Sequence, residues 1–92
     1  MGQERVREEK ERLEKYQSVL HQVLLSAVPA SNIAVIKTLS GTANAAAAAL
    51  EAIAVENIIG TLAGDDTLLV LFANERLSFA FCRDINIRYI KD

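Results

Sequence analysis

Residues 57–72 read NIIGTLAGDDTLLVLF and contain two apolar runs separated by a short polar turn. Each run is rich in Ile, Leu and Val and has the length of an ordinary strand. Gly64-Asp65-Asp66 between them is typical of a tight turn, because Gly reaches positive φ and Asp hydrogen-bonds its own backbone. The segment therefore predicts a β-hairpin with strands at about residues 57–63 and 67–72.

A second hairpin is expected upstream of the first. Residues 33–39 form a β-branched run that needs a neighbouring strand, and Pro29-Ala30-Ser31-Asn32 before it is a turn signal. The apolar residues that precede this turn fit either a helix or a buried strand. The need for a pairing partner favours the strand, so we expect a hairpin of roughly Leu20 to Val28 and Ile33 to Leu39.

Three helices are expected around these hairpins. Residues 3–15 are strong helix formers with opposite charges four apart. Residues 43–55 contain eight alanines, and Ser40-Gly41-Thr42 before them offers an N-cap hydroxyl. Asn74 is the expected N-cap of a last helix, whose apolar residues recur every four positions at Leu77, Phe81, Ile85 and Tyr89. The alanine-rich helix suits two roles equally, a close contact between subunits or a core helix under a sheet.

The expected fold class is α+β. A charged helical leader or linker over residues 1–16 precedes a ββαββα two-layer sandwich over residues 17–92, in which a four-stranded antiparallel sheet packs against helices. At 92 residues the chain is long enough for one core. Much of its apolar content is alanine, which buries little surface, so burial against copies of itself is a natural way to stabilise it.

The distribution of charge says more than the formal total of -2. Between Tyr16 and Glu75, Lys37 is the only Lys or Arg, whereas five side chains there are acidic: Glu51, Glu56, Asp65, Asp66 and Glu75. This stretch, with a net charge of -4, would repel DNA or RNA and attract a small cation.

The single cysteine, Cys82, excludes an intrachain disulfide, and one Cys with one His cannot build a metal site. No apolar run approaches the ~18 residues that span a bilayer. The sequence therefore predicts a soluble cytoplasmic protein without metal or membrane contact. His21, in an apolar segment, and Cys82, on the expected last helix, are interpreted as packing residues.

Asp65 and Asp66 are the strongest candidates for chemistry. One Asp is ordinary in a turn, but a second adjacent carboxylate is not needed there, and the two like charges repel. A plain turn and a site for a cationic ligand both remain open on this evidence. Hydrolysis is disfavoured, because adjacent turn residues diverge and no nucleophile or Gly-rich cradle accompanies them. We therefore expect no enzyme activity.

Two segments carry a resemblance to a known family. VIKTLSGTANA at residues 35–45 and IIGTLAGDDT at residues 58–67 resemble the carboxy-terminal domain of bacterial arginine repressors, which reads approximately V-x-K-T-x-P-G-N-A and then I-x-G-T-x-A-G-D-D-T. The second motif is specific, because it fixes eight of its ten positions. The resemblance covers about residues 24–72 well.

The resemblance implies that the domain forms trimers, two of which stack into a hexamer with L-arginine at the interface between them. Asp65 and Asp66 correspond to the family's ligand-binding aspartates. Asn44 and Glu51 hold the places of a Gln or His and an Asp in the family, and differ from them in side-chain length. Ala63 and Thr67 flank the aspartates and are expected to supply backbone or hydroxyl contacts.

The sequence departs from the family at three places. Ser40 stands where the family usually has Pro, and residues 78–92 lack the charged amphipathic pattern of its last helix. No winged helix-turn-helix precedes Tyr16, so we expect either a truncated regulator or a stand-alone sensor. DNA would be bound only through that missing amino-terminal domain.

These observations predict an arginine-sensing and oligomerisation domain of a transcriptional regulator of arginine metabolism. The alternative is a purely structural oligomerisation domain that no longer binds ligand, with Asn44 and Glu51 as marks of that loss. A small enzyme of related fold is disfavoured because catalytic residues are missing, and fold alone does not imply activity.

Overall fold

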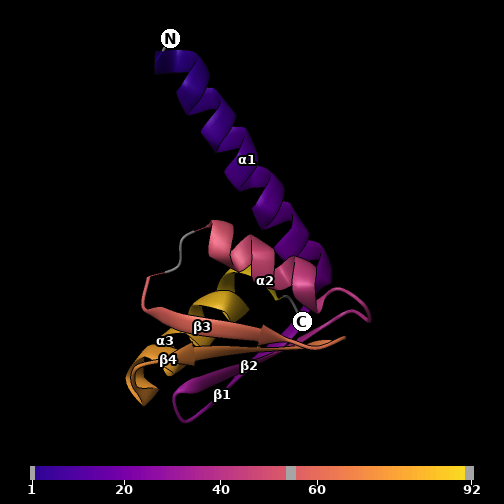
Figure 1. The fold of residues 1–92 in the computed structure, drawn as a ribbon, viewed down its shortest axis with the longest axis vertical. Coiled ribbons are helices and arrows are strands. Elements are labelled where there is room, and N and C mark those ends of the chain that lie inside the picture. Colours follow the sequence, from indigo (N-terminus) through magenta and orange to yellow (C-terminus); the bar gives the residue numbers. More distant parts are fainter. Residues whose placement is uncertain (1, 54–55, 91–92) are drawn as a thin grey trace.

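The computed structural model describes residues 2–53 and 56–90. A helix is followed by the order ββαββα, which confirms the predicted α+β class and the four-stranded antiparallel sheet (Figure 1). The elements are α1 (Gly2–Val23), β1 (Leu24–Ala30), β2 (Ile33–Thr38), α2 (Ala43–Ala52), β3 (Ile58–Ala63), β4 (Thr67–Phe72) and α3 (Glu75–Tyr89).

The sheet has the strand order β1-β2-β4-β3, and all three pairings are antiparallel. Both predicted hairpins are present, and they join through β2 and β4, where Ile36 lies opposite Leu68. Helix α2 connects β2 to β3 at the far edge. This order places the end of β2 beside the turn between β3 and β4, which is the arrangement on which the candidate site depends.

One face of the sheet forms the core. Strand residues alternate in burial along β2 and β4, and their buried side chains pack with α2, α3 and the end of α1. Fully buried side chains there include Leu20, Ile36, Leu50, Leu68, Val70 and Phe72. On α3 the predicted stripe is buried at Phe81, Ile85 and Tyr89, and the side chain of Asn74 accepts a hydrogen bond from the N–H of Leu77 at 3.0 Å, as predicted for the N-cap.

Cys82 is buried as a whole, whereas the alanine-rich helix is buried on one side only. Cys82 is buried, and this burial raises the pKa of its thiol, which agrees with a packing role. Helix α2 buries Ala43, Ala46, Ala47, Ala49 and Leu50 and leaves an opposite stripe exposed, at Asn44, Ala45, Ala48 and Glu51. It is therefore a core helix on one side and available for contacts on the other. The last two residues of the predicted helix, 54 and 55, lie outside the described residues.

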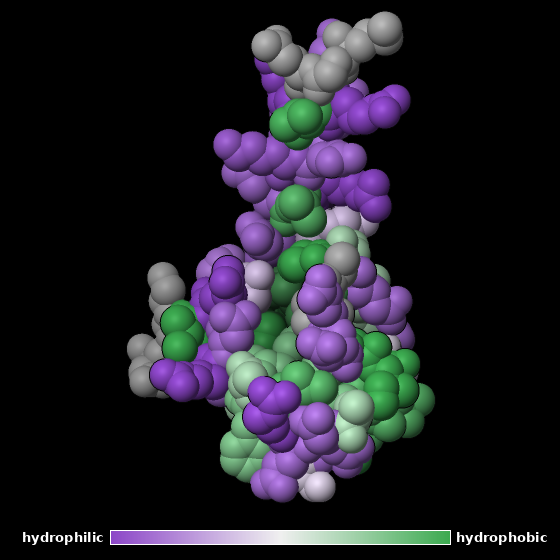
Figure 2. Space-filling view, turned by 90° about the vertical axis from the view of Figure 1, so that its left-hand side faces the viewer, coloured by the Kyte–Doolittle hydropathy of each residue, from purple (hydrophilic) through white to green (hydrophobic). Residues whose placement is uncertain are grey.

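Helix α1 corrects the first predicted strand. Its amino-terminal part projects from the body (Figure 1), and its surface is largely hydrophilic with isolated apolar areas (Figure 2). Val6 and Leu13 on this helix are exposed. The helix continues to Val23, so the strand expected from Leu20 begins four residues later than predicted. Leu20 and Val23 are three residues apart and both reach the core from one helical face. The division of the chain at residue 16 stays a prediction.

The turn between β1 and β2 begins later than predicted. Pro29 and Ala30 belong to β1, and the turn consists of Ser31 and Asn32, with Ser31 at φ 56°. β1 is an edge strand, where a proline without an N–H is tolerated. His21, expected in a strand, lies exposed on α1 with its ring edge-on to Tyr89 at a centroid distance of 4.9 Å.

The second face of the sheet is apolar and is not covered by α2 or α3. Strand register aligns one side chain from each strand in a row across it: Val28, Val35, Leu69 and Leu62. Val28 is 56% exposed and Leu62 is 67% exposed. At the end nearest the acidic turn, the row Ser26, Lys37 and Thr67 is polar. We call this surface the outer face.

Candidate functional site

The segment after β2 and the turn between β3 and β4 form one hydrogen-bonded unit. The N–H of Thr38 donates to the carbonyl of Asp66 at 2.8 Å. The carbonyl of Asp65 accepts from the N–H of Gly41 at 3.1 Å and from that of Ala43 at 3.3 Å. Gly41 has φ +79°, a conformation that glycine adopts without strain. The two sequence motifs therefore meet in space.

The start of α2 is capped from this turn and not from its own side chain. Thr42 is the N-cap residue, but its hydroxyl donates to the carbonyl of Leu39 at 2.6 Å and makes no capping bond to the helix. The carbonyl of Asp65 instead takes the N–H of Ala43, the first residue of α2. The predicted capping by a side-chain hydroxyl is therefore wrong, and α2 and the acidic turn are fixed to one another.

Each aspartate carboxylate is held by a hydroxyl group. Ser40 Oγ donates to Asp65 Oδ2 at 3.0 Å, and Thr67 Oγ1 donates to Asp66 Oδ1 at 3.0 Å. The same Thr67 hydroxyl accepts from Lys37 Nζ at 2.9 Å. Both aspartates are exposed. The turn therefore presents two carboxylates that face solvent, each fixed at one oxygen.

This arrangement can bind a cationic ligand. Ionised carboxylates accept several hydrogen bonds, and charge-assisted bonds from guanidinium or ammonium groups are the strongest of them. Within residues 2–53 and 56–90 the one ion pair is Arg88 with Asp84 at 2.8 Å, so neither turn carboxylate has an ionic partner there. The described part of the chain also contains no group of three or more His, Cys, Asp or Glu side chains that could hold a metal ion.

The other predicted ligand residues lie at different distances from the turn. Thr67 and Ala63 are at the ends of the two strands that the turn joins, and Asn44 is exposed in the first turn of α2, next to the capped Ala43. Glu51 is about 10 Å further along the axis of α2. Its Oε1 accepts from Thr61 Oγ1 at 3.0 Å, and it lines a separate hollow of about 260 Å³ beside β3. A single chain therefore does not bring Glu51 to the aspartates.

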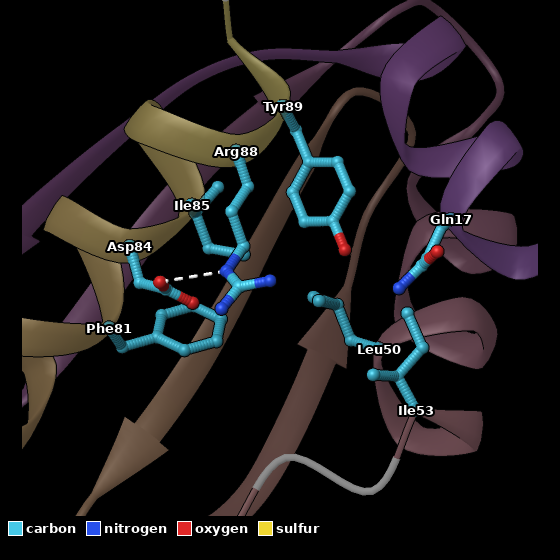
Figure 3. A pocket seen from close by; sticks show the side chains of 8 residues that line it. All are labelled: Gln17, Leu50, Ile53, Phe81, Asp84, Ile85, Arg88 and Tyr89. Atoms are coloured by element: carbon cyan, nitrogen blue, oxygen red, sulfur yellow. Dashed lines mark hydrogen bonds and ion pairs between the residues drawn. The ribbon is translucent and has the colours of Figure 1, made fainter. Parts of the chain in front are cut away.

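A further hollow, of about 270 Å³, lies between the three helices (Figure 3). Apolar side chains of α2 and α3 form part of its lining, and Gln17, Tyr89 and the Arg88–Asp84 pair lie around it. None of the residues predicted to bind ligand lines it. No helix of the described chain has the length and apolar character needed to cross a membrane.

Sequence reasoning missed two side-chain contacts at the turn. The sequence does not predict the bond from Ser40 to Asp65, because the two residues are 25 positions apart and belong to different motifs. The contact of Lys37 with Thr67 was missed as well, although alternation along β2 and β4 places both on the outer face. The register that sets them opposite one another is needed to see it.

Comparison with known proteins gives a consistent result. The family model described as "Arginine repressor, C-terminal domain" matches residues 20–86. An arginine repressor of Thermoanaerobacter sp. (strain X514) is 50% identical over 62 residues, which cover 67% of this chain and 41% of the relative. One of Lachnoclostridium phytofermentans is 48% identical over 56 residues, 61% of this chain and 37% of the relative. One of Clostridium acetobutylicum is 37% identical over 65 residues, 71% and 43%. The matched segment thus spans about two fifths of these relatives.

Proposed function

The chain belongs to the family of arginine repressor C-terminal domains, and we propose that it binds L-arginine at the Asp65–Asp66 turn and assembles with copies of itself. The relatives are named arginine repressors, which supports a role in the transcriptional regulation of arginine metabolism and not in catalysis. We propose that a part of the regulator outside this domain contacts DNA, because residues 16–75 carry a net charge of -4 and would repel it. The observation that carries the proposal is the pair of exposed carboxylates, each fixed at one oxygen by a hydroxyl.

Arginine matches this turn better than other small cations do. Its planar guanidinium pairs with a carboxylate through two parallel hydrogen bonds, and its α-ammonium can use the second carboxylate. Lysine would lose the two-point contact, because an ammonium is a point charge. We therefore propose Asp65 and Asp66 as the principal ligand residues, with Ala63, Thr67 and Asn44 around them.

The position of Glu51 supports a site shared between copies of the chain. Glu51 lies about 10 Å along α2 from Asn44, and within a single chain its carboxylate is hydrogen-bonded to Thr61 and not to the acidic turn. Glu51 and the aspartates could contact one ligand if Glu51 came from a neighbouring copy. Binding at such an interface would couple ligand to assembly, because a cation between facing carboxylates replaces repulsion by attraction. We propose trimers that stack into a hexamer with arginine between them.

The outer face supports self-association. Its central row is apolar across all four strands, and Val28 and Leu62 are more than half exposed. Contiguous apolar patches on a soluble domain usually mark a protein contact. We propose that this face is buried between subunits of the trimer, while the stripe of α2 with Asn44 and Glu51 faces the second trimer.

The alternative, a purely structural oligomerisation domain, is favoured by one contact. The carboxylate of Glu51 already accepts a hydrogen bond from Thr61, so a ligand would have to share or displace that bond. The two functions agree on self-association and differ in whether ligand binds.

A thermal-shift screen of the twenty amino acids, followed by sedimentation velocity with and without L-arginine, tests the proposal. A ligand that binds only the native protein adds about 2.7 kcal/mol of stability at one hundred times its dissociation constant. We expect arginine to raise the melting temperature and to favour the larger assembly, with lysine weaker. Stable oligomers that no amino acid stabilises would support the structural alternative, and a monomer in all conditions would contradict both.

A further inference from the structure

Ser40 contacts the acidic turn but is not among the residues predicted to bind ligand. Its hydroxyl donates to Asp65 Oδ2 at 3.0 Å, while the next residue, Gly41, donates its N–H to the carbonyl of Asp65 at 3.1 Å. Two consecutive residues therefore hold the same aspartate, one by its side chain and one by its backbone. The carboxylate is restrained in position as well as in rotamer.

The second oxygen of each aspartate carboxylate is available to a ligand. Among the described residues, Asp65 Oδ1 and Asp66 Oδ2 accept no hydrogen bond from the protein. Each carboxylate thus uses one oxygen for a hydroxyl and keeps the other for an incoming group. For Asp66 the hydroxyl belongs to the adjacent Thr67, whereas for Asp65 it comes from a residue 25 positions away.

We propose that Ser40 is a positioning residue for ligand recognition, which holds the carboxylate of Asp65 so that Oδ1 meets a cationic group of the ligand. This role rests on the proposed arginine site. An aspartate on an exposed turn otherwise exchanges between rotamers, and ordering it on binding weakens affinity. Serine is suited to this role because its hydroxyl is a neutral donor, which orients the carboxylate without repelling a cation.

Calorimetric titration of the full chain with L-arginine tests this role, using Ser40→Ala and Ser40→Thr. We expect Ser40→Ala to weaken binding roughly three- to tenfold, as expected for ordering one side chain. Ser40→Thr keeps the hydroxyl and should bind within about twofold of wild type. Ser18→Ala is the control, because Ser18 is an exposed serine on α1 and belongs to neither motif. Affinity of Ser40→Ala equal to wild type overturns the role of Ser40.

A second pair of titrations asks whether Ser40 acts through Asp65. In an Asp65→Ala background, measured at millimolar arginine, Ser40→Ala should change affinity less than twofold, because the carboxylate that it orients is gone. An equal loss in both backgrounds would show that Ser40 acts elsewhere and overturn the inference. The proposed function fails separately, if wild type does not bind arginine or if Asp65→Ala binds it undiminished.

Discussion

Two neighbouring rows of side chains cross the sheet on opposite faces, and both are apolar. Ala27, Ile36, Leu68 and Ala63 form the inner row, which α2, α3 and the end of α1 cover, and Val28, Val35, Leu69 and Leu62 form the outer row, which they leave open. An antiparallel sheet that faces water normally alternates apolar with polar residues. The chain's own helices therefore cover the inner apolar row, whereas the outer apolar row is open to contact with a second copy.

The comparison is tested most strongly by truncating one leucine on each face. Leu68 is fully buried and Leu62 is 67% exposed. Leu68→Ala should lower the free energy of unfolding by about 2–5 kcal/mol at any protein concentration, because it leaves a cavity in the core. Leu62→Ala should cost less than about 0.5 kcal/mol in dilute protein and more as concentration rises, because it weakens assembly. Urea denaturation at several protein concentrations measures both, and equal losses at every concentration would contradict the distinction.

A charge on the outer row should break the assembly without unfolding the chain. In Leu62→Lys the ammonium would be buried without a partner in a subunit contact, which costs several kcal/mol. We expect a shift from trimer or hexamer towards monomer in sedimentation velocity, with an unchanged circular dichroism spectrum. Leu13→Lys is the matched control, since Leu13 is 42% exposed on the projecting α1, away from the sheet. Oligomers of Leu62→Lys as stable as those of the control would exclude the outer face as the interface.

The buried and the exposed side of α2 can be compared in the same way, with a smaller expected effect. Ala47 is 8% exposed and belongs to the core, whereas Ala48 is exposed. Ala47→Leu should destabilise the fold by about 1–3 kcal/mol through overpacking, and Ala48→Leu should leave the fold unchanged. If the exposed stripe meets a second trimer, Ala48→Leu should reduce the hexamer in favour of the trimer, as seen by light scattering. A change of fold stability in Ala48→Leu and not in Ala47→Leu would reverse the assignment of the two sides.

The smallest expected effect is on the rate at which the thiol of Cys82 is chemically labelled. Burial raises the pKa of its thiol, so at pH 8 less of it is thiolate in the folded chain than in the unfolded one. The same shift affects the stability of the fold. The folded chain keeps the thiol proton to higher pH than the unfolded chain does, so the stability that this shift contributes is present below the ordinary pKa of the thiol and is lost as pH rises. Iodoacetamide should label the native protein much more slowly than protein in urea. Equal rates would show that α3 does not protect this residue.

Most of the fold was predictable because its signals are local. The runs around Gly64-Asp65-Asp66, the alanines of α2 and the Asn74 cap each specify one element. Leu20 to Val23 were misassigned because their apolar spacing fits both a helix and a strand, and packing against α2 decides between them. The turn was misplaced because Pro29 is tolerated in an edge strand, and edge position is a property of the whole sheet.

The site was predictable only in part. Asp65 and Asp66 are prominent in the sequence, and the resemblance pairs their motif with the one at residues 35–45. The bond from Ser40 to Asp65 depends on how a loop folds over a distant turn, and the contact of Lys37 with Thr67 depends on register. The bond between Thr61 and Glu51 was not predictable either, because the position of Glu51 on its helix does not determine which residue of β3 it contacts.

The central claim, that the two carboxylates bind arginine, is tested most directly by calorimetric titration of L-arginine into wild type, Asp65→Asn and Asp66→Asn. Asparagine keeps side-chain size and turn preference, so the ligand-free fold should be intact. We predict binding to wild type and a loss of roughly 2–4 kcal/mol in each variant, ~30-fold to 1000-fold in affinity, because each removes a charge-assisted bond at the proposed interface between trimers. Undiminished affinity in both variants would mean that the carboxylates only shape the turn, and would contradict the account.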